Sequence, residues 1–213
     1  MREPALILLA MLGFGVVHSL LASHAAKTVA GGVFGDRHSR GWYRLVYNGL
    51  AVISVLPALA LMVALPDREL YRIPAPFSAL ALILQAVGAL GIVYSLYQLD
   101  LAHFSGLKQW AGWLKRVEVH SESDTSASHL VVDGLHRYVR HPLYTSSLIV
   151  LWLASPMTIN RLTFIIAATA YFYVGSIFEE RKLVAEFGDA YRDYQRRVPR
   201  LAPRIRPRFT ASS

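Results

Sequence analysis

The sequence contains no cysteine among its 213 residues. A disulfide framework, a thiolate metal site and a cysteine nucleophile are therefore excluded. Charged residues are also scarce, at 17% of the chain, while hydrophobic residues make up 54%. Soluble domains carry about 25% charged residues and an apolar share of about half or less. This composition indicates a chain whose solvent is lipid.

Two sequence patterns are missing as well. The chain has no Gly-x-Gly-x-x-Gly loop after a strand, so no Rossmann dinucleotide fold is expected. It shows no inverted repeat of the kind that builds many transporters. Eight histidines are present, but none forms a His-x-x-x-His pair or a compact helical ligand set, and no metal site is predicted.

The net charge of +8 is explained better by membrane topology than by nucleic acid. Five apolar stretches are candidate membrane spans, and 18 of the 22 lysines and arginines lie in the three segments that follow the first, third and fifth of them. The positive-inside bias then places the N-terminus outside and the C-terminus in the cytoplasm. We expect an integral membrane protein, with the lipid bilayer as a partner and no nucleic acid.

The five predicted spans cover residues 4–23, 46–65, 77–98, 143–155 and 162–178. A helix needs about 20 apolar residues to cross the hydrocarbon core, so the fourth stretch is short and is expected to be tilted or partly buried in protein. A six-residue connection joins it to the fifth, which predicts a helical hairpin. The fold class is therefore all-α, a polytopic membrane bundle of about five spans with a C-terminal hairpin and a cytoplasmic tail helix.

The chain is expected to form one integrated membrane domain with two regions. Residues 1–107 would hold the first three spans, and residues 108–213 would form the region that carries the motifs described below. The sequence leaves the oligomeric state open.

Two polar clusters fall at the predicted cytoplasmic boundary. Pro142 suits the first turn of the fourth helix, which places Arg140 and His141 at the helix entrance. Because the hairpin sets the start of this helix level with the end of the next, Glu179 and Glu180 should converge with these side chains and with Tyr144. An ordinary structural interpretation stays open, in which Arg140 pairs with a glutamate, the tyrosines anchor the interface and the arginines hold the tail to anionic lipid.

The segment from His129 to Pro203 resembles the superfamily of isoprenylcysteine carboxyl methyltransferases and phospholipid methyltransferases. The resemblance lies in the spacing Leu130-x3-Gly134-x5-Arg140-His141-Pro142-x-Tyr144, followed by Glu179-Glu180-x2-Leu183-x3-Phe187-Gly188-x2-Tyr191-x2-Tyr194 and Val198-Pro199. It implies S-adenosylmethionine as the cofactor. By resemblance, the cofactor would contact His129, Leu130, Val131, His136, His141, Pro142, Leu143, Tyr144 and Glu179.

The sequence departs from the prenylcysteine enzymes at one position. Those enzymes place a substrate-contacting arginine four residues before the glutamate that matches Glu179, and here that residue is Gly175. A carboxylate acceptor would lack its counter-ion, which argues against prenylated substrates. Other motifs, among them His18-Ser19 and Trp152-x3-Pro156-Met157-Thr158, resemble bacterial methanethiol S-methyltransferases and a sister family linked to denitrification.

We therefore predict an enzyme that moves a methyl group from S-adenosylmethionine to a small thiol or another small lipophilic acceptor. Catalytic roles are predicted for Arg140, Glu180 and His18, the last because a histidine within a span is a functional candidate by default. His18 could act as a base or orient the substrate, and a structural hydrogen bond is its alternative role. Two alternative functions are a non-catalytic cofactor-binding protein linked to nitrogen-oxide metabolism and a methyltransferase of a prenylcysteine or lipid acceptor.

Overall fold

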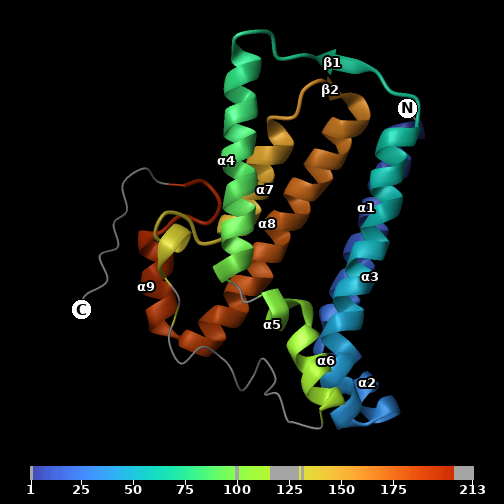
Figure 1. The fold of residues 1–213 in the computed structure, drawn as a ribbon, viewed down its shortest axis with the longest axis vertical. Helices are drawn as coiled ribbons and strands as arrows, with labels where there is room; N and C mark the ends of the chain where they lie inside the picture. The colour runs from blue at the N-terminus through green and yellow to red at the C-terminus, as the bar shows by residue number, and fades with distance from the viewer. Residues whose placement is uncertain (1, 99–100, 116–129, 131, 204–213) are drawn as a thin grey trace. The chain divides into compact units, whose positions relative to one another are not determined.

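The computed structural model describes residues 2–98, 101–115, 130 and 132–203, and nearly all of its regular structure is helical. The predicted all-α fold class is confirmed (Figure 1). The chain divides into two compact units. The first comprises Met1–Glu69, Tyr97–Ser126 and Thr158–Ala167, and the second comprises Leu70–Leu96, Ala127–Met157 and Ala168–Ser213. The predicted division after residue 107 stays a prediction.

The first unit is built around the pairing of two long apolar helices, α1 (Arg2–Ala22) and α3 (Asp36–Ala64). The short helices α2 (His24–Phe34), α5 (Leu101–Ser105) and α6 (Leu107–Leu114) complete it. Tyr43 on α3 donates to the Leu21 carbonyl at 2.7 Å, which fixes the end of α1. Gly106 has φ +91°, and a Cβ there would lie 2.5 Å from the Leu45 backbone nitrogen, so only glycine allows this approach of α6 to α3.

The second unit holds α4 (Phe77–Gln98) up to Leu96, the 3-10 helix η1 (Gly134–Arg137), α7 (Pro142–Trp152) and α9 (Asp189–Arg197). It also holds the larger part of α8 (Ile159–Phe187), which begins in the first unit. Two short strands, β1 (Glu69–Tyr71) and β2 (Met157–Thr158), pair in a two-stranded sheet. Gly188, with φ +57°, ends α8 and begins the predicted tail helix α9.

Four of the predicted spans are helices long and apolar enough to cross a membrane by length and composition: α1, residues 41–64 of α3, α4 and α8. The predicted fourth span is instead the 11-residue helix α7, about 16 Å long at the usual rise per residue. It begins at Pro142, as predicted, with His141 as its N-cap. The chain then continues as irregular backbone to Ser155, whose hydroxyl accepts from the Ile73 amide just before α4 begins.

Helix α7 packs between α4 and α8. On one side, small residues of α4 let the two backbones approach, since a Cβ at Gly88 would lie 3.1 Å from the Ser146 carbonyl oxygen. Gln85 of α4 also donates to the Val150 carbonyl at 2.9 Å. On the other side, Trp152 donates to Thr169 of α8 at 3.1 Å, which confirms the predicted hairpin. Irregular backbone at membrane depth is tolerated where protein covers it in this way.

Candidate functional site

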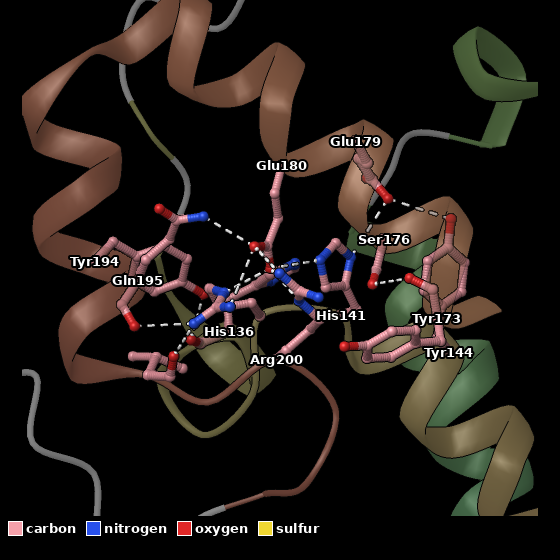
Figure 2. A network of polar contacts seen from close by, with 12 residues as sticks. His136, His141, Tyr144, Tyr173, Ser176, Glu179, Glu180, Tyr194, Gln195 and Arg200 are labelled. Atoms are coloured by element: carbon pink, nitrogen blue, oxygen red, sulfur yellow. Dashed lines mark hydrogen bonds and ion pairs between the residues drawn. The ribbon is translucent and has the colours of Figure 1, made fainter. Parts of the chain in front are cut away.

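The centre of the second unit's polar cluster is the carboxylate of Glu180, a residue that is only 2% exposed (Figure 2). Its Oε1 accepts from Arg140 Nε at 2.7 Å, His141 Nε2 at 3.1 Å and Arg200 Nε at 3.2 Å. Its Oε2 accepts from Gln195 Nε2 at 2.8 Å, Arg200 Nη2 at 3.0 Å and Arg140 Nη2 at 3.2 Å. A carboxylate offers about four lone-pair sites, so six donors fill it completely.

Arg140 connects this carboxylate to the chain that follows α9. Its guanidinium donates to Glu180 and, through Nη1, to the carbonyls of Gln195, at 2.9 Å, and Val198. Its backbone amide donates to the Pro199 carbonyl at 2.9 Å. The pairing of Arg140 with a glutamate, which belongs to the structural interpretation left open above, is present. All of these contacts are internal, so they favour a role in positioning.

His141 lies between the two glutamates and is buried. Nδ1 is 3.3 Å from Glu179 Oε2, and Nε2 is 3.1 Å from Glu180 Oε1. Only the doubly protonated ring can donate to both carboxylates. Burial opposes the charged ring and lowers its pKa, but the hydrogen bonds to the two carboxylates outweigh burial, and the pKa of His141 lies above its ordinary value.

Glu179 forms the open edge of the cluster, because half of its side chain is exposed. Its Oε2 accepts from the Tyr144 hydroxyl at 3.2 Å as well as facing His141. The Tyr144 ring stacks on His141 at a centroid distance of 5.3 Å and on Phe172 at 5.0 Å. The described partners of Glu179 all bond one oxygen, so the adjacent glutamates have different environments: Glu180 is saturated and Glu179 is partly available.

His136 lies on η1, and its backbone carbonyl accepts from the Tyr194 hydroxyl at 2.7 Å. Its ring nitrogen Nδ1 is buried and has no hydrogen-bond partner among the described residues. Burial and the nearby His141 lower the pKa of His136, so the neutral ring is favoured. A neutral, buried and unpartnered ring nitrogen is suited to a polar ligand atom.

The structure brings together most of the residues that the sequence analysis proposed. Arg140, His141, Tyr144, Glu179 and Glu180 converge as predicted. Pro142 and Leu143 open α7 beside them, and Leu130 packs against the buried cluster of Tyr191, Tyr194 and Val198. The predictions for His129 and Val131 lie outside the described residues.

The third predicted catalytic residue, His18, belongs to the first unit. Its Nε2 bonds the Tyr47 hydroxyl of α3 at 2.5 Å, and its ring contacts those of Tyr47 and Phe14. This is the structural hydrogen bond given above as its alternative role. The catalytic roles of His18, Arg140 and Glu180 stay predictions.

Sequence reasoning missed three polar residues of the cluster, namely Thr145, Gln195 and Arg200. Gln195 and Arg200 both bond Glu180, and the Thr145 hydroxyl donates to the Leu201 carbonyl at 2.8 Å. The available signal was the adjacency of two glutamates at the predicted membrane edge, because two carboxylates there need more than one arginine as partner. In the part of the chain that the structure describes, no group of three or more His, Asp or Glu side chains could hold a metal ion.

Comparison with known proteins places this arrangement in a family. The chain is 30% identical to a methanethiol S-methyltransferase of Mycobacterium tuberculosis over 212 residues, which cover 94% of this chain and 79% of the relative. It is 51% identical to methanethiol S-methyltransferase 2 of Bradyrhizobium diazoefficiens over 71 residues, but that alignment covers only 33% of this chain and 27% of the relative.

A more distant relative is the protein-S-isoprenylcysteine O-methyltransferase of Schizosaccharomyces pombe, 30% identical over 54% of this chain and 53% of that protein. No family model matches the chain. No solved structure matches it either. The apolar helices and the near full-length mycobacterial relative together show an integral membrane protein. The chain belongs to the family of membrane methyltransferases that includes the methanethiol S-methyltransferases.

Proposed function

We propose that this protein transfers a methyl group from S-adenosylmethionine to a small thiol of the methanethiol type. The observation that carries the proposal is the contrast between the two adjacent glutamates. Glu180 is buried and saturated, whereas Glu179 is half-exposed and keeps one oxygen outside the described network. An ordered carboxylate at the edge of a cluster can accept from ligand hydroxyl or amino groups.

The residues present fit S-adenosylmethionine. Glu179 would accept from ribose hydroxyls or from the amino group, and the unpartnered Nδ1 of His136 would bond a polar atom of the cofactor. The stacked rings of Tyr144 and Phe172 offer an apolar, aromatic wall. When bound, S-adenosylmethionine supplies the methyl group as an electrophile on its sulfonium sulfur.

The contribution of the chain is mainly positioning. His141 holds Glu179 through Nδ1, and Tyr144 holds the same carboxylate oxygen through its hydroxyl. Fixing the donor and acceptor in the geometry of an in-line displacement supplies much of the acceleration. The acceptor thiol must lose its proton, because the thiolate is the competent nucleophile. The residue that accepts this proton stays a prediction, with His18 as the candidate.

The acceptor class is supported by Gly175, one helical turn before Glu179 on α8. A Cβ at Gly175 would meet nothing within 4 Å, and this position offers no counter-ion for a carboxylate. A small thiol carries no carboxylate, so it needs no counter-ion at this position. The name of the mycobacterial relative supports the same class.

We further propose that the polar cluster faces the cytoplasm of a bacterial inner membrane. Positive-inside bias supports this orientation, because 18 of the 22 lysines and arginines lie in the segments on that side. The N-terminus would then be outside and the C-terminal tail in the cytoplasm.

The proposal is tested with S-adenosylmethionine labelled in the methyl group. Membranes carrying the chain, or its Glu179→Gln variant, would be incubated with methanethiol and labelled cofactor. We expect labelled dimethyl sulfide from the parent and much less from the variant. Cofactor binding without any product would favour the non-catalytic alternative. Label transferred to lipid or prenylcysteine instead of the thiol would contradict the proposed acceptor.

A further inference from the structure

The chain after α9 forms a strap across the entrance of α7. The strap is defined here as residues 198–201. The amides of Arg140 and His141 donate to the carbonyls of Pro199 and Arg200, at 2.9 and 3.2 Å. One turn into α7, Thr145 donates to the Leu201 carbonyl at 2.8 Å. The strap therefore accepts from the two backbone amides that precede α7 and from one side chain of its first turns.

Arg200 ties the strap to α8 through its side chain. Its guanidinium contacts both oxygens of Glu180, with Nε at 3.2 Å from Oε1 and Nη2 at 3.0 Å from Oε2. The same guanidinium lies over the Tyr173 ring, 5.5 Å from its centroid. Two hydrogen bonds from one guanidinium to a carboxylate fix the orientation of the carboxylate and also offset its charge.

Arg200 and His141 share one carboxylate oxygen. Oε1 of Glu180 accepts from His141 at 3.1 Å, from Arg200 at 3.2 Å and from Arg140 at 2.7 Å. Two guanidinium cations thus offset the negative charge that would otherwise hold the proton of His141. The titratable and charged groups around the His141 ring are Glu179, Glu180, Tyr144, His136, Arg140 and Arg200.

We infer that Arg200 is a positioning residue of the methyl-transfer site, acting through Glu180 to set the orientation and charge of the His141–Glu179 pair. The inference rests on the proposed function, since it assigns Arg200 a purpose in holding the group that would bind the cofactor. Arg200 is 28% exposed at its side chain and is not among the candidate site residues that the sequence analysis proposed.

The test compares Arg200→Ala and Arg200→Lys with Arg192→Ala as a matched control. Arg192 lies in the same tail but pairs only with Asp189 among described residues, on an exposed surface. NMR of the histidine ring protons in detergent, assigned with a His141→Gln variant, follows the charge of His141 without any ligand. Arg200→Ala should move the titration midpoint of His141 upward by about one pH unit, because a neighbouring cation is lost.

Arg200→Lys keeps the cation and should titrate like the parent, as should Arg192→Ala. A purely structural loosening would not give this dependence on charge. An unchanged or lowered midpoint in Arg200→Ala, or an equal shift in either of the other variants, would overturn the inference.

Activity provides the second readout. In the labelled-methyl assay, Arg200→Ala should lower turnover about 10- to 100-fold through mispositioning, with substantial recovery in Arg200→Lys. Full turnover in Arg200→Ala would overturn the inference. If the parent itself shows neither cofactor binding nor turnover, the proposed function fails, and the ring titration still decides the role of Arg200 in setting the charge of His141.

Discussion

The adjacent residues Glu179 and Glu180 allow one substitution to test two roles. Glutamate to glutamine preserves shape and removes only the charge and one acceptor oxygen. At Glu180 each oxygen faces three donors. Whichever way the new amide turns, its NH2 group faces donors from the arginines. At Glu179 the amide oxygen can still accept from Tyr144, and the side chain is half-exposed.

The expected magnitudes differ accordingly. Removing one partner of a buried ion pair costs about 3–5 kcal/mol, a large part of a typical stability of about 5–15 kcal/mol. The cost applies at Glu180 because its side chain is 3% exposed and that of Arg140 is 9% exposed. An exposed pair contributes about 0–1 kcal/mol, which is the expectation for Glu179. The two variants should differ in unfolding free energy by about 3 kcal/mol.

The assay is equilibrium unfolding of the detergent-purified proteins, followed by circular dichroism, with cofactor affinity measured on the folded samples. Glu180→Gln should unfold far more readily than the parent. Glu179→Gln should keep the parent's stability and lose cofactor affinity. Equal stability of the two variants would refute the account of Glu180 as a buried structural centre.

Three further outcomes follow from the structure. The pKa of His141 is raised above its ordinary 6.5, so its stabilising contribution is fully present below pH about 6.5 and is lost as pH rises through the raised value. The stability difference between the parent and His141→Gln should therefore shrink at alkaline pH, and a constant difference would contradict this. Gly88→Leu should destabilise by about 1–3 kcal/mol through overpacking, because a Cβ would meet Val150 at 3.0 Å, while Gly13→Leu, with nothing within 4 Å, should be neutral in the same unfolding assay. Gly175→Arg should fold like the parent, given the open space at its Cβ, and should bind a prenylcysteine carboxylate that the parent rejects in a competition assay; binding by the parent would contradict the assigned acceptor class.

Most of the fold was predictable because a bilayer imposes a simple length rule on apolar helices. The third span agrees with the structure at both ends, since Phe77–Gln98 carries no charged residue and is long enough to cross a membrane. Helix α7 was less predictable. Its sequence is as apolar as that of a membrane span. Only its contacts with α4 and α8 explain why this helix can be as short as 11 residues.

The sequence predicted which residues converge at the site. Pro142 marked a helix start and the hairpin aligned the two ends, so Arg140, His141 and the glutamates had to meet. The sequence could not distinguish Glu179 from Glu180. Neighbours on a helix point about 100° apart, and which of them faces the protein depends on packing.

The contribution of the strap also escaped the sequence analysis. Arg200 was one of several arginines in a basic tail, and charge alone assigned it to the membrane surface. Its contacts arise because α9 packs Tyr191 and Tyr194 inward and so returns the chain to the entrance of α7.

The most direct test of the central claim is a calorimetric titration of S-adenosylmethionine into detergent-purified protein, with methanethiol turnover measured on the same sample. The account predicts saturable binding by the parent, production of dimethyl sulfide, and loss of binding in a folded Glu179→Gln variant. An absence of binding by a parent protein shown to be folded would contradict the account, and the two glutamates would then have only a structural role.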